Sequence, residues 1–385
     1  MKKIKVLTIF GTRPEAIKMA PVVLELKKQS ERFESIVAVT AQHREMLDQV
    51  LKIFDITPDY DLNVMKANQT LSEITANVLM GLDHIMKEAK PDIVLVHGDT
   101  TTTFAASLSA FYNQIKIGHV EAGLRTWDKY SPFPEEMNRQ LTDVMADIYF
   151  APTSESKKNL LQENHLEEKI FITGNTAIDA LKATVKEDYH MPLFDKISTD
   201  SKLVLVTMHR RENQGKPMRQ VFNAMRQVVE LHHDVELIFP VHLNPTVQKM
   251  AAEVLGDHPR IHLIAPLDVV DFHNLIAKSY MIMSDSGGVQ EEAPSLGVPV
   301  LVLRDTTERP EGVAAGTLKL VGTQTETIIK EMINLLENEE EYKRMSKAGN
   351  PYGDGKASKR ILDSIAHEIG LEALRPEDFE KEIQK

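Results

Sequence analysis

Short apolar runs alternate with longer amphipathic segments along almost the whole chain, and this alternation constrains the fold more than any other feature. Most of these runs lack the strict apolar–polar alternation of a half-exposed strand, as is typical of parallel strands buried on both faces. Helix-period segments such as 217–231 and 243–255 lie between them. The repeated strand–helix–strand pattern predicts an α/β protein built from doubly wound parallel sheets.

The 385 residues suit two domains of average size better than one core. A polar stretch at 190–202 looks like a domain crossing, so we expect domains over 1–180 and 181–360, with a helix from about 360 packing back on the first. The expected strands of the first half are Ile4–Phe10, Ser35–Thr40, Ile93–His97, Ile117–Glu121, Ile148–Ala151 and Ile170–Thr173. Those of the second half are Leu203–Thr207, Glu236–Pro240, Ile261–Ile264, Met281–Ser284 and Val300–Leu303.

Composition excludes several classes of function. The chain has no cysteine, which rules out a disulfide scaffold, a thiolate nucleophile and a cysteine-bound metal, and which suits a reducing cytoplasm. Its net charge of −12 argues against a nucleic-acid binder. We interpret the N-terminal MKKIKVLTIFG as a first buried strand rather than a signal peptide, and we expect no membrane span because the apolar runs are short.

The first predicted strand leads into the sequence GTRPEAIKMAP. Gly11 permits a tight turn and a close approach to the backbone. Thr12 and Glu15 have the spacing of a capping box, which places a helix N-terminus at the end of the strand. That N-terminus, with Arg13 and Lys18, would attract a phosphate or a carboxylate. A capped helix with exposed basic side chains explains the same residues, and both interpretations stand.

Three carboxylates are predicted at the carboxyl-end side of the first sheet. Asp99 follows a strand and either serves chemistry or caps the next helix. Glu121 ends the next strand, where burial of an unpaired carboxylate would be costly. Glu135 and Glu136 open a helix, where at least one of them is an ordinary partner of the helix dipole. Clustered acids can divide acid and base roles near neutral pH, so Asp99, Glu121 and Glu135 together predict proton transfer.

The second half carries a candidate pyrophosphate site. The segment MIMSDSGGVQEEAPSLG runs from a strand through Ser286, Gly287 and Gly288 into a helix. Consecutive glycines let the backbone approach a pyrophosphate, the serine hydroxyl adds a donor, and a glutamate one turn later could accept from ribose hydroxyls. A simple tight turn is the alternative interpretation.

Basic side chains follow two other strands of the second half. His209, Arg210 and Arg211 come after the strand at 203–207, and they fit either anion binding or a solvated run of charge. Arg304 and Arg309 follow the last predicted strand and could neutralise phosphate. The chain has no GxGxxG, Walker A or HExxH sequence and no metal-binding histidine spacing, so we expect neither a cofactor nor a metal.

Taken in order, these segments resemble the non-hydrolysing UDP-N-acetylglucosamine 2-epimerases. The resemblance extends to about residue 365 and rests on the motifs GTRPEAIKMAP, VHGDTTTT, GHVEAGLRT, SPFPEEMNRQ, FITGNTAIDA, HRREN, PVHLNP, DSGGVQEEAPSLG, RDTTERPEG and NPYGDG. It implies the glycosyltransferase-B fold, with two Rossmann-like domains facing across a cleft that binds a UDP-sugar. It also implies reversible epimerisation of UDP-GlcNAc to UDP-ManNAc, through anti elimination of UDP to 2-acetamidoglucal and its re-addition.

The resemblance also implies roles for individual residues. Acid–base chemistry would fall to Asp99, Glu121 and Glu135, with His209 counted among the catalytic residues. The residues that would bind UDP and the substrate are Arg13, Lys18, Arg139, His209, Phe272, Ser286, Gly287, Gly288, Glu292 and Arg309.

Bacterial members of the family share a second UDP-GlcNAc site that activates the enzyme. The corresponding residues here would be Gln42, His43, Glu135, Arg210 and His242. Glu45 and Asn68 depart from the pattern of some relatives. The family further suggests a homodimer and a role in teichoic-acid or capsule synthesis.

Three other functions remain open on the sequence. A UDP-sugar-dependent glycosyltransferase shares the fold and the nucleotide cradle, although no motif identifies an acceptor groove. A hydrolysing 2-epimerase would release free ManNAc and UDP. A sugar-nucleotide sensor without catalysis would have no use for three carboxylates at strand ends.

Overall fold

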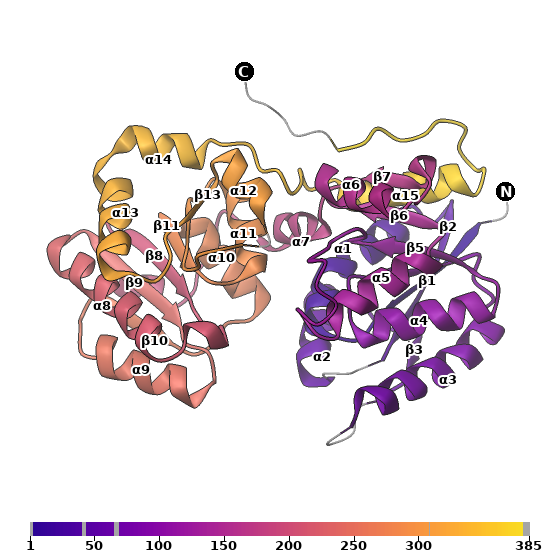
Figure 1. Ribbon diagram of the computed structural model, residues 1–385, viewed down its shortest axis with the longest axis horizontal. Coiled ribbons are helices and arrows are strands. Elements are labelled where there is room, and N and C mark those ends of the chain that lie inside the picture. The colour runs from indigo at the N-terminus through magenta and orange to yellow at the C-terminus, as the bar shows by residue number, and fades with distance from the viewer. Residues whose placement is uncertain (1–2, 41–43, 65–68, 308, 380–385) are drawn as a thin grey trace. The chain divides into compact units, whose positions relative to one another are not determined.

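The computed structural model describes residues 3–40, 44–64, 69–307 and 309–379. Its chain divides into two compact units, each with one parallel sheet (Figure 1). The first unit comprises Met1–Ala183 and Tyr352–Glu380, and the second includes Thr184–Pro351. The prediction of two Rossmann-like doubly wound sheets is therefore confirmed. None of the helices in the described ranges is long and apolar enough to cross a membrane.

The first sheet has the order β3-β2-β1-β4-β5-β6-β7, and all of its strands are parallel. The strands are β1 (Ile4–Phe10), β2 (Phe33–Val39), β3 (Tyr60–Asp61), β4 (Ile93–His97), β5 (Lys116–Val120), β6 (Ile148–Ala151) and β7 (Ile170–Ile172). The predicted strands agree to within two residues at each end, but β3 was not predicted because two residues leave no hydrophobic period to detect.

Helices cover both faces of this sheet. They are α1 (Arg13–Lys28), α2 (Arg44–Ile53), α3 (Leu71–Ala89), α4 (Thr101–Tyr112), α5 (Glu135–Met145), α6 (Ser154–Gln162), α7 (Thr176–Thr184) and α15 (Ala357–Glu368), with a 3-10 turn η1 (Glu167–Lys169). Buried side chains of α1, α2 and α15 form one core with the sheet, and those of α3 and α4 form another. Helix α15, from the C-terminal part of the chain, packs against α1 within this unit.

The second sheet has the order β10-β9-β8-β11-β12-β13 and is also parallel throughout. Its strands are β8 (Lys202–Thr207), β9 (Val235–Pro240), β10 (Ile261–Ile264), β11 (Met281–Ser284), β12 (Val300–Val302) and β13 (Leu318–Leu320). The three-residue strand β13 was not predicted, for the same reason as β3.

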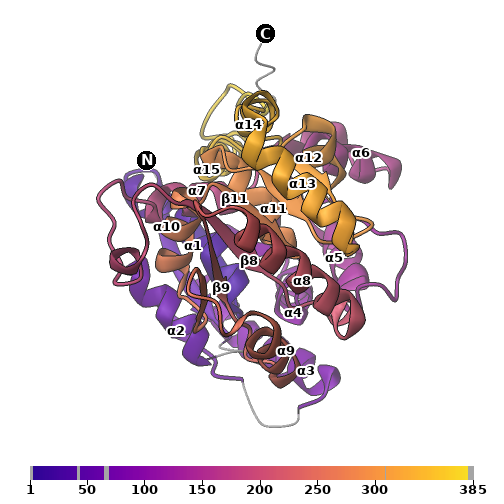
Figure 2. The ribbon, with the colours of Figure 1, turned by 90° about the vertical axis from the view of Figure 1, so that its left-hand side faces the viewer.

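The second sheet is likewise covered on both faces. Its helices are α8 (Lys216–Leu231), α9 (Pro245–Leu255), α10 (Val269–Lys278), α11 (Gly287–Glu292), α12 (Pro310–Ala315), α13 (Thr325–Glu337) and α14 (Glu339–Ser346), with 3-10 turns η2 (Phe194–Lys196), η3 (Arg211–Asn213) and η4 (Ala293–Leu296). Helices α8 and α13 lie side by side (Figure 2) and share one core with α9, whereas α10 and α11 pack in the other.

Candidate active site

In each sheet, the predicted site residues lie where the strand order reverses. In the first sheet this point falls between β1 and β4, which lead to Gly11 and to Asp99 respectively. In the second it falls between β8 and β11, which lead to His209 and to Ser286. Ligands of open α/β sheets bind outside the carboxyl ends of the strands at such a point. Both units therefore offer a candidate ligand site of the kind that the sequence predicts.

The turn after β1 is packed tightly against its neighbours. A Cβ atom on Gly11 would lie 2.1 Å from Oγ1 of Thr40 and 2.6 Å from Oγ1 of Thr102, so only glycine fits. Buried Glu15 accepts hydrogen bonds from the backbone N–H groups of Gly11 and Thr12 at 3.0 and 2.7 Å. Its other oxygen accepts from two threonine hydroxyls in the turn after β4, at 2.7 and 3.2 Å. Glu15 thus fixes the start of α1, with Arg13 as its first residue, against the β4–α4 turn.

Glu121 follows β5 directly and has an unusual backbone conformation. Its φ of 66° lies in the left-handed region, which is uncommon outside glycine and asparagine and clusters at functional sites. The side chain is 11% exposed, and its Oε2 forms an ion pair with the ammonium group of Lys18. Oε2 also accepts a hydrogen bond from Nδ2 of Asn175 at 2.9 Å. The carboxylate that the sequence predicted at a strand end is therefore paired rather than isolated.

The surroundings of Glu121 keep it ionised. Burial by itself would raise the pKa of this carboxyl group, but the positive charge of Lys18, together with the neighbouring His97, holds the pKa well below its usual range. Nε2 of His97 lies 3.7 Å from Oε2, and neither ring nitrogen of this buried histidine has a hydrogen-bond partner among the described residues. Within the same ranges, Oε1 of Glu121 accepts no hydrogen bond, which leaves one carboxylate oxygen available to a ligand.

Asp99 is a partner of Arg139 and not a helix cap. The N-cap of α4 is Thr100, whose hydroxyl accepts from the backbone N–H of Thr103, so the capping interpretation of Asp99 is wrong. Oδ2 of Asp99 contacts the guanidinium of Arg139, which also lies 3.1 Å from the buried Glu136. Asp99 is therefore held at the switch point by Arg139 of α5, which also pairs with Glu136.

The two glutamates that open α5 have different surroundings. Glu136 is fully buried and accepts hydrogen bonds from the backbone N–H groups of Thr126 and Trp127, both at 3.1 Å, and from Gln140 at 2.9 Å. Glu135 is half-buried, and within the described ranges its carboxylate has no hydrogen bond or ion pair. Glu136 therefore anchors the loop before α5, and Glu135 remains available for chemistry.

In the second unit, buried Asp285 organises the loop after β8. It accepts from the backbone N–H groups of His209 and Arg210, at 3.1 and 2.9 Å, and from Nδ2 of Asn213 at 3.0 Å. The ring of His209 stacks on that of His242, with centroids 5.3 Å apart. Partial burial lowers the pKa of His209, against the opposing effect of Asp285, so its ring is neutral at pH 7.

The glycine pair after β11 leaves the backbone accessible. A Cβ on Gly287 would come no nearer than 3.8 Å to Arg309, and one on Gly288 no nearer than 3.9 Å to Glu292. Neither residue has the positive φ that would require glycine. Packing within the described residues therefore does not explain these glycines, whereas the close approach of a ligand to the backbone would. The Ser286 hydroxyl does not cap α11.

One ion pair and one histidine–carboxylate contact hold the polar side chains around this turn. Nε of Arg309 contacts buried Glu291, and Nε2 of His273 lies 3.7 Å from Glu292. Phe272 precedes His273 on α10 and packs against the core beneath α11. Arg309 and Glu292 thus lie next to the glycine pair. Their assignment, with Phe272, to a UDP site stays a prediction.

The predicted activator residues are only partly covered. Arg210 and His242 both neighbour His209 in the second unit, and Glu135 lies in the first. Gln42, His43 and Asn68 fall outside the described residues, as does the side chain of Glu45. Where side chains are described, no three His, Asp or Glu residues are grouped so that they could hold a metal ion.

Several relatives share this architecture. A family model described as UDP-N-acetylglucosamine 2-epimerase matches residues 25–366. The UDP-N-acetylglucosamine 2-epimerase of Bacillus subtilis (strain 168) is 62% identical over 379 residues, which cover 98% of this chain and 99% of that protein. The two doubly wound parallel sheets and the solved structures of relatives place the chain in the glycosyltransferase-B fold class. The chain belongs to the UDP-N-acetylglucosamine 2-epimerase family.

Two solved structures of relatives contain nucleotides. The S. aureus MnaA–UDP co-structure is 54% identical, has a TM-score of 0.90, and covers 98% of this chain and 100% of its own. The Neisseria meningitidis UDP-GlcNAc 2-epimerase bound to UDP-GlcNAc is 52% identical, has a TM-score of 0.85, and covers 94% and 99% respectively.

The sequence did not reveal every contact of this site. Asn175, His97 and Asp285 lie within motifs noted above, but no role was assigned to them. Asn175 follows the end of a strand, a position that could have drawn attention to it. The roles of His97 and Asp285 depend on which strands are neighbours, which a single sequence does not state.

We predict that Lys18→Met raises the pKa of Glu121, because burial then acts without its main opposing charge. In the wild type that pKa is lower in the folded state. The ion pair therefore stabilises the fold above the ordinary Glu pKa, and this stabilisation is lost as pH falls through the folded value. Lys18→Met should thus cost about 2–4 kcal/mol near neutrality and much less in acid.

Carbon-13 NMR of the Glu121 carboxyl group and urea unfolding at several pH values measure these effects. Lys27→Met, an exposed lysine on the same helix, is the matched control and should change neither. An unaltered Glu121 titration in Lys18→Met would contradict the assigned pairing.

Proposed function

We propose that this chain interconverts UDP-GlcNAc and UDP-ManNAc reversibly without hydrolysis. A base removes the proton at carbon 2 while the bond between carbon 1 and the phosphate oxygen breaks, and UDP leaves with the bonding electrons. The 2-acetamidoglucal that results is then protonated at carbon 2 from the opposite face, and UDP re-forms the bond to carbon 1. The reactant and the product are isomers, so atoms and charge balance over the cycle.

The observation that carries this proposal is the environment of Glu121. It combines a left-handed backbone conformation, an ionised and largely buried carboxylate, a lysine counter-charge and one unoccupied oxygen. A left-handed backbone and a buried charge both lower the stability of the fold, and such features are concentrated at functional sites. Asp99 and Glu135 supply further carboxylates at the same sheet edge, and the two proton transfers fall to members of this group. Lys18 and Arg139 support the charge that develops.

UDP binding falls to the second unit in this account. Arg309 stabilises the departing pyrophosphate, and the backbone at Gly287 and Gly288 approaches it closely. Glu292 accepts from the ribose hydroxyls. Holding UDP after elimination matters because its return to carbon 1 then needs no second encounter. Relatives have been solved with UDP and with UDP-GlcNAc bound, which supports a UDP-sugar as the ligand of this chain.

We also propose the family's activator site for this chain, with Arg210 and His242 among its residues. Both neighbour His209, so UDP-GlcNAc bound there would act directly on a substrate-site residue. The use of the product in a cell-wall or capsule polysaccharide stays an expectation from the family.

A homodimer is the assembly that we propose. Helices α4 and α5 pack together and expose Phe111 (58%), Tyr112 (65%), Leu141 (39%) and Val144 (72%), a set of large apolar side chains of the kind that interfaces cover. Sedimentation equilibrium should give twice the chain mass, and Val144→Lys should shift it towards the monomer. A wild-type monomer at micromolar concentration would contradict the proposal.

Incubation with UDP-GlcNAc alone in heavy water tests the reaction. We expect proton NMR to show UDP-ManNAc at equilibrium with UDP-GlcNAc, and deuterium at carbon 2 of both. Accumulation of free ManNAc and UDP would identify a hydrolysing enzyme, and a requirement for an acceptor would identify a glycosyltransferase. Asp99→Asn should lower the rate by about 10²–10⁴-fold, as the loss of an acid–base group does, whereas a sensor would be unaffected.

Gly288→Ala tests the nucleotide site separately. The added methyl group has room in the protein and replaces a helical glycine, so unfolding stability should be unchanged or higher by about 0.5–1 kcal/mol. UDP affinity measured by calorimetry should fall at least about 10-fold, since the methyl group occupies the space of the ligand. Gly11→Ala is the control, because its Cβ has no room and stability should fall instead. Unchanged UDP affinity in Gly288→Ala would remove this turn from the site.

A further inference from the structure

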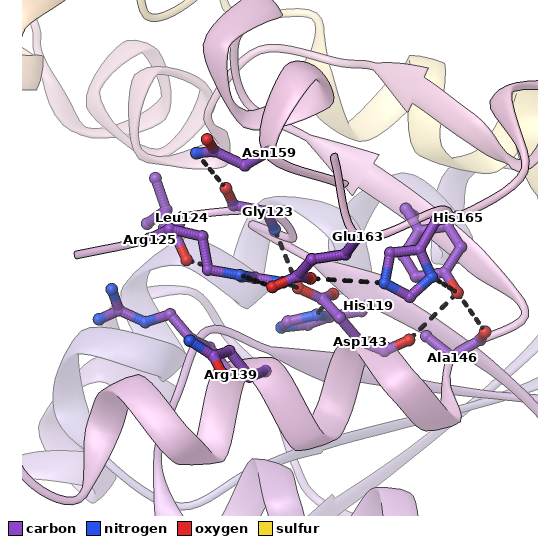
Figure 3. Close-up of polar contacts among 12 residues, drawn as sticks. His119, Gly123, Leu124, Arg125, Arg139, Asp143, Ala146, Asn159, Glu163 and His165 are labelled. Atoms are coloured by element: carbon purple, nitrogen blue, oxygen red, sulfur yellow. Dashed lines mark hydrogen bonds and ion pairs between the residues drawn. The ribbon is translucent and has the colours of Figure 1, made fainter. Parts of the chain in front are cut away.

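Figure 3 shows a largely buried cluster of charged side chains formed by His119, Arg125, Asp143 and Glu163. A hydrogen bond to Gly98 places the cluster beside the turn that carries Asp99. His119 belongs to β5, two residues before Glu121, and both it and Asp143 of α5 are fully buried. Arg125 follows β5 and bridges two acids, at 2.7 Å from Oδ2 of Asp143 and 2.9 Å from Oε1 of Glu163. The established and proposed roles above use none of these residues.

Both ring nitrogens of His119 face hydrogen-bond acceptors. Nδ1 lies 2.6 Å from Oδ1 of Asp143, and Nε2 lies 2.8 Å from the backbone carbonyl oxygen of Gly98. A carbonyl oxygen only accepts, so Nε2 must carry a proton. A proton must also lie between Nδ1 and Oδ1, because a lone pair on each would repel at this distance. The one question is whether this second proton belongs to the histidine or to the aspartic acid.

The surroundings place that proton on His119. Asp143 already accepts from Arg125 and, at 3.2 Å, from the backbone N–H of Gly123, and both contacts favour a carboxylate. Burial would raise the pKa of Asp143, but His119 and Arg125 together lower it. Imidazole is also the stronger base, by about 2.6 pKa units for the free side chains.

The charges of the cluster then balance. Imidazolium His119 and Arg125 supply two positive charges, and Asp143 and Glu163 supply two negative ones. Half-buried His165 lies 3.5 Å from Glu163. Its Nδ1 is 2.9 Å from the hydroxyl of Tyr149, and that hydroxyl is also within hydrogen-bond distance of two backbone carbonyl oxygens, one in α5 and one at its C-cap. Neutrality matters here because an uncompensated charge at this depth would be strongly unfavourable.

The contacts of the cluster tie together the two turns that bear the candidate catalytic acids. His119 donates to Gly98, the residue before Asp99, while Asp143 accepts from Gly123, two residues after Glu121. The backbone N–H of Gly98 also donates to Val120 at 2.9 Å. We infer that His119 is a positioning residue with a proton on each ring nitrogen, and that its two N–H donors hold the Asp99 and Glu121 turns in register for proton transfer. The part that concerns proton transfer rests on the function proposed above.

Neutron diffraction from deuterium-exchanged crystals at about pH 8, where an ordinary histidine is neutral, tests the protonation state without any assay. We expect deuterons on both Nδ1 and Nε2 of His119. A deuteron on Oδ1 of Asp143, or none between the two side chains, would overturn the inference whether or not the chain is an epimerase.

His119→Gln tests the positioning role. It leaves the cluster with one excess negative charge and one donor fewer, and we expect kcat to fall about 10²-fold because a displaced catalytic group costs about that much. UDP affinity should stay within about twofold, since most of the proposed UDP-binding residues, including the Gly287–Gly288 turn and Arg309, belong to the other unit. Adding Asp143→Asn restores charge balance, so the double variant should recover stability and part of kcat relative to His119→Gln.

His262→Gln is the matched control, because His262 also pairs with a largely buried glutamate, Glu236, at 2.6 Å but in the second unit. Its kcat should equal that of the wild type. Wild-type kcat in a folded His119→Gln protein would contradict the positioning role, as would a double variant that folds as stably as the wild type and shows no recovery of kcat. A chain that never makes UDP-ManNAc would contradict the proposed function and leave the neutron result to decide the protonation state.

Discussion

The ion pair between Lys18 and Glu121 is the interaction on which the first unit's site depends. A carboxylate at the end of β5 could not stay ionised in so buried a position without a nearby cation, and α1 supplies that cation from the far side of β4. The pair therefore links the segments that follow β1 and β5 across the intervening β4. Glu15 hydrogen-bonds to the turns after β1 and β4, and His119 hydrogen-bonds to the turn after β4. These contacts explain why so much buried charge is concentrated at one sheet edge.

Under the proposed function, the two units divide the chemistry between them. The first gathers acids with individual counter-charges, an arrangement suited to moving protons. The second presents a bare backbone at Gly287 and Gly288, with Arg309 beside it and a histidine loop ordered by Asp285, an arrangement suited to holding a nucleotide. This division suits the proposed elimination, in which UDP is retained. The residues that bind UDP and the carboxylates that move protons at carbon 2 must act at the same time but on different atoms.

Most of the strands and several site residues could be predicted from the sequence, and the elements and contacts that were missed have physical causes. The parallel sheets followed from continuous apolar runs, whereas the Tyr-Asp of β3 and the Leu-Lys-Leu of β13 contain no such run. Asp99 was given a possible capping role because local rules cannot see Arg139, which is forty residues away. The identity of the structural acid among Glu135 and Glu136 depended on backbone N–H groups of a preceding loop. Pairings such as Glu121 with Asn175 require the strand order, which no local pattern contains.

Positional isotope exchange tests the central claim, that UDP leaves and returns, most directly. UDP-GlcNAc labelled with oxygen-18 in the bridge between carbon 1 and the β-phosphorus is incubated with the enzyme, and phosphorus-31 NMR locates the label. The account predicts that the label moves from the bridge into non-bridging positions of the β-phosphate while UDP-ManNAc forms. Formation of UDP-ManNAc with the label still entirely in the bridge would contradict it, because epimerisation would then proceed without cleavage of the bond to UDP.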